Sequence, residues 1–471
     1  ALQKSGKLAE AQEVYESIRD REPENRAAAV ELLRVYERSR QLDRAIPILE
    51  EFVKSQPGNI GIKTEYAVML LRVRRFADSA RVFEEVLKAD PGNKEALRYY
   101  ASLLSEQQKI DEADAILKRL EAVDPDDLDA SYRRGINFLE ARRLDEAEKV
   151  LLGLREKAAK QSKSKDGAEL AQIDGQLGYV AYLRKDYALA RKRVQPVLFT
   201  KDPDEVLNGQ AFNLLAQIAR DDEKPAEGLA LVREVLAKVP EEKRAPALVG
   251  AHGEFLARSS DPKDQAEGDK VLAALAAKDR LGALAAADAW QRLEKHDKAV
   301  ATAKIGLQAT PNDPDLLFRL AASLERDKKI PEAVAAFEKL LAVRPDHAPA
   351  LNYVGYMWAE RNENLDKARA YIQKAVDLEP GNGAYLDSLG WVYFQLGQLD
   401  NAEKYLKDAA RLNPDDSAIE DHLGDLYAKK GDLVKARAAF TRALALKPED
   451  GGEKLRKKLS ALEGKVEATR K

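Results

Sequence analysis

The sequence predicts an all-α protein, an α-solenoid in which stacked helix-turn-helix units form a right-handed superhelix. Three observations lead to this prediction. Prolines recur at a fixed interval, a small residue precedes each of them at constant spacing, and apolar residues at offsets of 3 and 4 define helical faces. A repeat period of 20 to 50 residues is typical of stacked units that bury their apolar faces only against one another.

The prolines mark the expected ends of the units. Within each of two series they are 34 residues apart, except for one interval of 35. Most stand in turn sequences such as Gln-Pro-Gly-Asn at 56–59, which stop a helix. The two series are Pro23, Pro57, Pro91 and Pro125, and Pro311, Pro345, Pro380, Pro414 and Pro448.

The second helix of each unit is expected to pack closely against the first. A small residue lies twelve positions before each proline, and in most units a larger apolar residue follows one helical turn later. Two helices approach closely only where such a side chain is small. The small residues are Ala11, Ala45, Ser79, Ala113, Ala299, Ala333, Ala368, Ala402 and Ala436.

The first helix of each unit is clearest near the C-terminus. Its apolar positions follow offsets of 3, 1 and 3, which define one face of an α-helix. Two consecutive copies are Leu351, Val354, Gly355 and Trp358, and Leu386, Leu389, Gly390 and Tyr393.

This combination of Leu-Gly, an aromatic residue, a small residue and a closing proline resembles the tetratricopeptide repeat family. The resemblance covers residues 1–159 and 278–448 and implies that the first helices line a concave side. Residues 350–356 and 384–391 also resemble bacterial outer-membrane repeat lipoproteins, some of which are adaptors for periplasmic proteases. That second resemblance implies a periplasmic location and a protein partner, with a cytoplasmic scaffold as the alternative. Any targeting segment or lipid anchor would lie upstream of Ala1.

The repeats divide the chain into four predicted parts that hold thirteen units. Residues 1–159 form the N-terminal units, the first of which is truncated because residues 1–5 read as the end of a helix. Residues 160–277 form irregular units with inserted polar stretches at 160–167 and 259–265. In one of them the packing glycine is either Gly250 or Gly253. Residues 278–448 are regular units, and residues 449–471 are a capping helix and tail.

The terminal helix is predicted over residues 453–468. Leu455, Leu459, Leu462 and Val466 follow a 4, 3, 4 spacing that suits packing on the last unit. The alternative is a basic surface for acidic lipid or nucleic acid. The basic residues expected to cover its other side are Lys454, Arg456, Lys457, Lys458 and Lys465.

Composition argues against catalysis. The chain has no cysteine, its net charge is −3, and its longest strictly apolar run covers only residues 271–277. These values exclude thiolate sites and disfavour nucleic-acid binding and a membrane span. The histidines lack helical metal-site spacing and are expected to be surface or packing residues. We therefore expect no enzyme activity, no metal and no cofactor. The four are His252, His296, His347 and His422.

A first candidate site lies on three consecutive first helices near the C-terminus. Trp391 falls outside the apolar face of its own helix, so we expect it to be partly exposed beside Tyr356. Such an aromatic pair beside carboxylates suits a partner's basic or amidic side chain. The alternative is that Trp391 and Phe394 pack against the neighbouring helix pair. The hypothesised partner-binding residues are Asn352, Tyr356, Asp387, Trp391, Phe394, Asp421 and Asp425.

A second, weaker candidate groove lies in the N-terminal units and would receive an amphipathic helix. Its residues are Val68, Leu71, Arg98, Ile136 and Leu139, and the alternative is that they thicken the core. A clamp for acidic chaperone tails is disfavoured, because repeats of that kind resemble one another in an Asn just after the packing glycine. No unit has Asn there; that position holds, for example, Tyr179 and Gln217.

The predicted function is a scaffold or adaptor that binds a protein or peptide in a concave groove. The alternative is a regulatory subunit of an enzyme complex, such as a periplasmic protease, whose catalytic part is another chain. Helical-repeat recognition of RNA is disfavoured because the chain lacks a basic stripe.

Overall fold

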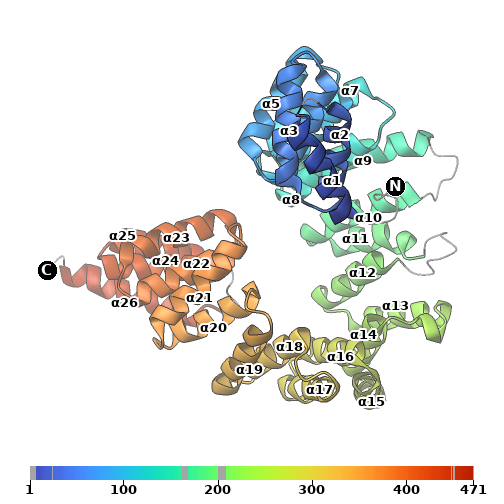
Figure 1. Cartoon of the computed structure of the whole chain (residues 1–471). Helices are drawn as coiled ribbons and strands as arrows, with labels where there is room; N and C mark the ends of the chain where they lie inside the picture. Colours follow the sequence, from blue (N-terminus) through green and yellow to red (C-terminus); the bar gives the residue numbers. More distant parts are fainter. Residues whose placement is uncertain are drawn as a thin grey trace. The chain divides into compact units, whose positions relative to one another are not determined.

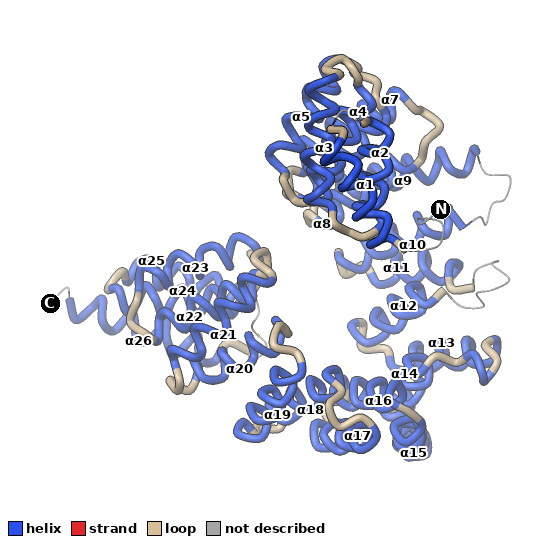
Figure 2. Tube along the Cα trace, in the orientation of Figure 1, coloured by secondary structure: helices blue, strands red, loops and turns tan. Residues whose placement is uncertain are grey.

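The structure, a computed structural model, describes residues 7–23, 25–161, 168–199, 208–446, 448 and 451–469. The side chains of residues 168 and 463–469 lie outside this description. All regular elements in the described ranges are helices, and no strand occurs there (Figure 2). The predicted all-α solenoid is therefore confirmed, while its right-handed superhelical twist stays a prediction. No described helix is long and apolar enough to cross a membrane.

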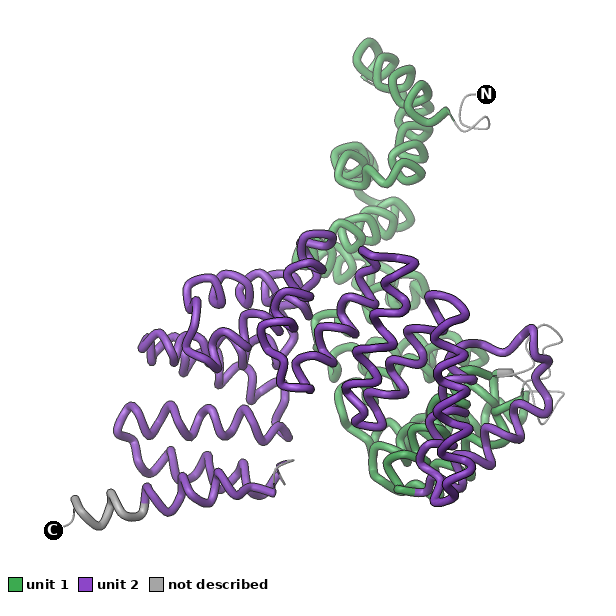
Figure 3. Tube along the Cα trace, turned by 90° about the horizontal axis from the view of Figure 1, so that it is seen from below, with its two compact units in different colours: residues 1–223 green, residues 224–471 purple. Residues whose placement is uncertain are grey.

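The chain forms two compact units, residues 1–223 and 224–471, and each is described by itself (Figure 3). Both units consist of α-helices that follow one another in antiparallel pairs (Figure 1). The predicted four-part division stays a prediction; its irregular part, residues 160–277, spans the boundary between the two units.

In the first unit, α1 is the first described helix, and the helices after it follow in pairs; the predicted truncation of the first repeat stays a prediction. Residues 162–167 and 200–207 lie outside the described ranges, so the predicted loop after residue 160 and Pro203 are not described. Its helices are α1 (Leu8–Arg21), α2 (Arg26–Arg38), α3 (Leu42–Ser55), α4 (Ile60–Arg72), α5 (Phe76–Ala89), α6 (Lys94–Glu106), α7 (Ile110–Val123), α8 (Asp129–Glu140), α9 (Leu144–Gln161), α10 (Ala168–Leu183), α11 (Tyr187–Val194), η1 (Gln195–Val197) and α12 (Gly209–Asp221).

The second unit starts with α13 and ends with the predicted terminal helix, α26. Its helices are α13 (Pro225–Lys238), η2 (Glu241–Lys243), α14 (Pro246–Ala257), α15 (Pro262–Lys278), α16 (Arg280–Arg292), α17 (His296–Ala309), α18 (Pro314–Arg326), α19 (Ile330–Val343), α20 (Ala348–Glu360), α21 (Leu365–Leu378), α22 (Gly383–Gln395), α23 (Leu399–Leu412), α24 (Ser417–Lys430), α25 (Leu433–Ala445) and α26 (Glu453–Thr469).

The small residues lie where the paired helices meet. All nine predicted positions are buried, with at most 1% of each residue exposed. The glycine of the first helix packs against the larger apolar residue of the second. A Cβ atom placed on Gly390 would lie 2.7 Å from Leu406, and one on Gly424 would lie 2.3 Å from Phe440. Both glycines are therefore required for close approach of the helices rather than for flexibility.

Packing also resolves the ambiguous register of the irregular unit. A Cβ atom on Gly253 would lie 2.6 Å from Leu272, and one on Gly268 of the partner helix would lie 2.7 Å from the Gly253 carbonyl oxygen. Gly253 is thus the packing glycine between α14 and α15, whereas Gly250 faces Ala285 of α16. The intervening turn also differs from that of most units. Between α14 and α15 no residue has left-handed angles, whereas the corresponding turns contain a left-handed residue such as Lys328 or Gly397, directly after the C-cap.

The terminal helix packs as a cap. Leu455 and Leu462 are buried and Leu459 is partly buried against the core of the last units. Lys454, Arg456 and Lys457 are exposed, which agrees with the predicted polar outer side. The side chains of residues 465 and 466 lie outside the description.

Candidate partner-binding site

Three consecutive first helices, α20, α22 and α24, bring the C-terminal candidate residues together. Each helix starts at a polar side chain that accepts a backbone N–H: His347, Asn382 and Asp416. These caps fix where each helix begins. Because α22 contacts both α20 and α24, residues at equivalent positions on the three helices form rows across one face.

A buried ion pair lies at the centre of this face. His422 Nδ1 of α24 is 2.9 Å from Asp387 Oδ1 and 3.1 Å from Asp387 Oδ2 of α22, and both side chains are buried. Burial alone would lower the pKa of His422, but the Asp387 carboxylate outweighs burial and raises the pKa above its usual value. The pair therefore ties two neighbouring repeat units through a charge-assisted hydrogen bond.

Three aromatic rings stack beside this ion pair. The Trp391 ring lies between Phe394, at a centroid distance of 4.8 Å, and His422, at 4.2 Å, and both pairs are nearly parallel. Lys429 Nζ lies 4.3 Å from the Phe394 ring and so extends the stack with a cation–π contact. The stack contains residues of α22 and α24 only, so it joins one repeat to the next.

The expectation that Trp391 is partly exposed is wrong. Only 9% of its surface is exposed, and it belongs to the continuous core of the second unit. The spacing of apolar residues within α22 indicates only which side chains lie on that helix's own apolar face. His422, on the next first helix, covers the Trp391 ring from outside that face. The alternative interpretation, packing against the neighbouring helix pair, is therefore correct for Trp391.

The acidic border of the candidate site is neutralised from within the chain. Lys458 Nζ of α26 lies 2.6 Å from Asp421 Oδ1 and 2.6 Å from Asp425 Oδ2. The expectation that Lys458 covers the polar outer side of the terminal helix is wrong for this reason. Burial raises the pKa of Asp425, and Lys458 opposes that shift. Asp387, Asp421 and Asp425 are therefore all paired, not free carboxylates.

Two candidate residues remain at the edge of the face. Tyr356 and Asn352, one turn apart on α20, are half-buried, and the Tyr356 ring centroid is 6.5 Å from that of His422. Burial, followed by the nearby Glu360 and Asp387 carboxylates, raises the pKa of Tyr356.

Two polar atoms of this face have no hydrogen-bond partner among the described residues. They are Asn352 Oδ1 on α20 and Trp391 Nε1 on α22, and both atoms are buried. Leaving a buried donor or acceptor unpaired costs about 1 to 3 kcal/mol. A buried polar atom of this kind needs a partner from outside the described residues, such as an ordered water, an ion or a bound group.

The N-terminal candidate groove is largely filled. Val68 and Leu139 are buried, and Leu71 and Ile136 are half-buried. Arg98 Nη2 is 2.7 Å from Asp127 Oδ2, so this cation already has a carboxylate partner. For Val68 and Leu139 the expectation of a groove lining is wrong, and the alternative interpretation, a thickened core, fits their burial.

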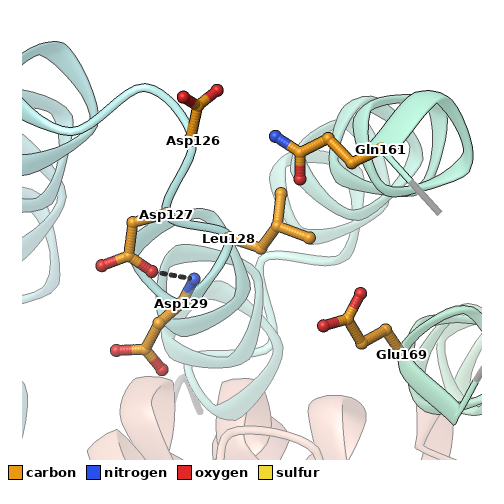
Figure 4. A pocket seen from close by; sticks show the side chains of 6 residues that line it. All are labelled: Asp126, Asp127, Leu128, Asp129, Gln161 and Glu169. Atoms are coloured by element: carbon orange, nitrogen blue, oxygen red, sulfur yellow. Dashed lines mark hydrogen bonds between the residues drawn. The ribbon is translucent and has the colours of Figure 1, made fainter.

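A shallow acidic pocket lies near the start of α8 (Figure 4). Within it, the backbone N–H of Asp129 donates to Asp127 Oδ1 at 2.8 Å. Asp127 and Asp129 also face Arg98, so two of the carboxylates are partly neutralised. No group of three or more His, Asp or Glu in the described ranges is arranged to hold a metal ion. The pocket lining is Asp126, Asp127, Leu128, Asp129, Gln161 and Glu169.

Sequence reasoning missed the His422–Asp387 pair and the role of Lys458. His422 was compared only with residues of its own helix, where Asp425 stands three positions on. A comparison of residues one repeat apart would have indicated this pair. Asp387 occupies the same repeat position as Asp421, which directly precedes His422, so Asp387 and His422 lie on neighbouring helices at nearly the same level. Lys458 had no comparable signal, since its partners depend on how α26 docks.

Comparison with known proteins agrees with the repeat pattern. Tetratricopeptide repeat models match residues 1–60, 70–134, 318–383 and 388–451. These segments are tetratricopeptide repeats, which confirms that part of the resemblance. The resemblance to outer-membrane lipoprotein adaptors stays a prediction.

Among curated proteins, a TPR repeat-containing protein of Pseudomonas aeruginosa is 33% identical over 113 residues. The match covers 24% of this chain and 19% of that relative, so the chain spans about a fifth of its length. Among solved structures, yeast Tom70 has a TM-score of 0.45 at 14% identity, with 94% of this chain and 96% of that chain covered. A Thermus thermophilus TPR protein has a TM-score of 0.34 at 25% identity and covers 39% of this chain and 98% of its own.

Proposed function

We propose that this protein is a non-enzymatic scaffold or adaptor that binds partner proteins, and that the face of α20, α22 and α24 is one of its contact surfaces. The observation that carries the proposal is the pair of buried, unpartnered polar atoms, Asn352 Oδ1 and Trp391 Nε1. Stacked repeats support the general class, because they create extended surfaces on which partner segments lie.

The chemistry of the face favours an amide as the recognised group. One atom is an acceptor and the other is a donor, and a peptide group or an Asn or Gln side chain offers the complementary N–H and C=O. A basic group is less suited to this face, because Lys458 already pairs with Asp421 and Asp425, and His422 with Asp387.

The ring stack supports this role as a rigid platform. Trp391, Phe394 and His422 hold α22 and α24 together, while Tyr356 borders the face from α20. A partner segment that packs against the Tyr356 ring would lie beside Asn352, one turn away on the same helix. A binding surface built on rigid helices loses little conformational entropy when the partner docks.

The proposal is tested with Asn352→Leu, which removes the unpartnered acceptor while nearly keeping the side-chain volume. A partner is first isolated by cross-linking to the full chain, and its affinity is then measured. We expect the variant to melt at the same or a higher temperature, because a buried unpaired acceptor has been removed. We also expect it to bind more weakly.

Tyr356→Ala serves as the companion variant, with Lys404→Ala on the exposed side of α23 as the control. Truncating a central aromatic contact typically costs about 2 kcal/mol or more of binding. We expect that loss for Tyr356→Ala and none for Lys404→Ala. Unchanged affinity in both Asn352→Leu and Tyr356→Ala, with folding intact, would exclude this face as a contact surface.

A further inference from the structure

Three tyrosines form an aromatic ladder in the first unit, and the first of them is exposed. On α10, the ring centroids of Tyr179 and Tyr182 are 5.9 Å apart, and the rings are nearly parallel at 20°. Tyr187, the first residue of α11, continues the ladder with its centroid 6.2 Å from that of Tyr182. Tyr179 is 37% exposed, and the other two are half-buried. Tyr179 immediately follows the packing glycine Gly178, the position that the family resemblance places on the concave side.

A carboxylate on the next first helix, α12, completes the cluster. Asp221 accepts hydrogen bonds from Tyr182 Oη at 2.7 Å and from Gln217 Nε2 at 2.8 Å. Both donors are neutral, and within the described part of the chain no cation forms an ion pair with Asp221. A carboxylate has about four acceptor positions, so about two remain available to a further donor.

The charged groups that act on the two partly enclosed tyrosines are acidic. Burial and the Asp221 carboxylate raise the pKa of Tyr182 to about 12. Burial, then Asp221 and Asp222, also raise the pKa of Tyr187. Asp222 has a partner in Arg191, whose Nη2 lies 2.6 Å from its Oδ2. Asp221 is therefore the charged group that acts most strongly on both tyrosines.

We propose that Tyr179, Tyr182, Tyr187 and Asp221 form a site that receives an arginine side chain of a partner protein. A guanidinium group stacks on aromatic faces and donates several hydrogen bonds to a carboxylate in one plane. Both features are present here: stacked phenol rings, and a carboxylate that has acceptor capacity and no cation partner among the described residues. The site goes beyond the proposed α20–α22–α24 surface and lies in the other unit.

A purely structural role does not account for the ladder. Tyr100, which packs in the core, stacks on the buried Phe83 and is itself buried. Tyr179 instead leaves more than a third of its surface exposed. Exposed aromatic groups beside an acceptor are typical of binding surfaces, where tyrosine supplies a large rigid contact area.

The test selects ligands on the full chain from a random twelve-residue phage-displayed library, and repeats the selection on the Tyr179→Ala/Tyr187→Ala double variant. We expect peptides that bind only the unaltered chain to be enriched in arginine relative to the input library. Enrichment of acidic or uncharged peptides alone, or the same peptides on both proteins, would overturn the proposal. So would the absence of any peptide that depends on the tyrosines.

Affinity measurements then isolate the guanidinium. The best selected peptide is compared with a copy in which citrulline, a neutral group of the same shape, replaces each arginine. We expect the citrulline copy, and separately Tyr179→Ala and Asp221→Asn, to bind about tenfold more weakly or worse. Tyr179→Phe keeps the ring and should bind as the unaltered chain does. Melting temperatures of all variants show that folding is intact.

Equal affinity for the arginine and citrulline peptides would contradict the assignment. Because the site lies in residues 1–223, that outcome would leave the proposed surface on α20, α22 and α24 unaffected. Conversely, loss of binding in the Asn352→Leu experiment alone would not bear on the tyrosine ladder.

Discussion

Tyr179 and Trp391 occupy the same position of the repeat, directly after the packing glycine of a first helix, yet their environments differ. Tyr179 is 37% exposed, whereas Trp391 is 9% exposed. The cause lies on neighbouring helices. Trp391 is covered by His422 of the next unit, which Asp387 holds in place. The repeat position therefore sets the direction of a side chain, and the adjacent unit decides whether it is buried.

The residues that bury Trp391 have no counterparts around Tyr179. Asp387 lies one helical turn before Trp391, and the equivalent residue before Tyr179 is Gly175. A Cβ atom on Gly175 would meet nothing within 4 Å. On α12, the repeat position equivalent to His422 is occupied by Leu214, whose side chain cannot pair with a carboxylate. The residues around Trp391 thus connect two neighbouring repeats, whereas Tyr179 stays exposed.

The largest expected difference between the two regions is in stability. Trp391→Ala should destabilise the helices around it by about 3 to 5 kcal/mol, because it leaves a cavity in a stacked core. Tyr179→Ala should change stability by no more than about 0.5 to 1 kcal/mol, as at exposed positions. Hydrogen exchange of α22 and α24, compared with α10 and α12, measures each effect locally, since long repeat arrays need not unfold in one step. Similar losses of protection at both sites would contradict the comparison.

A second difference concerns the close approach of paired helices. Ala402→Leu should cost about 1 to 3 kcal/mol, because the residue is fully buried where α23 meets α22. Lys404→Leu, on the exposed side of the same helix, should be nearly neutral. Thermal denaturation of the two variants compares these positions directly. Equal effects would mean that the register assigned to the second helices is wrong.

The repeat units could be predicted from the sequence, but only part of the candidate site could. Periodic prolines and small residues predict which faces meet inside one unit, and the buried Ala402 and Ala436 confirm that logic. Contacts between neighbouring repeats join side chains about one repeat apart in the sequence, such as Asp387 and His422. The apolar spacing within α22 alone therefore gave the wrong exposure for Trp391. The tyrosine ladder was partly visible, because three tyrosines lie within nine residues, but Asp221 joins it only through the packing of α12 on α10.

A smaller effect is expected where the terminal helix neutralises the acidic row. Lys458→Met should destabilise the end of the second unit by about 1 kcal/mol, since the lysine is partly exposed. The loss should shrink at lower pH, because without Lys458 the pKa of the buried Asp425, already raised, rises further and the carboxylate protonates more readily. Melting at several pH values checks this, and a loss independent of pH would argue against the pairing.

The smallest effect is expected from the titration of His422. Its folded-state pKa is raised by Asp387, so the stabilisation is fully present below the unfolded value of about 6.5 and is lost as pH rises through the folded value. Tyr356, Glu360 and Asp421 also face this group. Exchange protection of α22 and α24 should therefore fall as pH rises from about 6.5 through the folded value, after correction for intrinsic exchange rates. Asp387→Asn should flatten this dependence, whereas an unchanged profile in that variant would contradict it.

Site-specific photo-crosslinking tests most directly the claim that first-helix faces bind partners. A photoreactive phenylalanine analogue replaces Tyr179, Tyr356 or Lys404 in the full chain, which is then irradiated with extract from its source. The account predicts crosslinks to discrete partner proteins from positions 179 and 356 and none from position 404, on the second helix α23. Crosslinks from 404 alone, or equal patterns from all three positions, would contradict it.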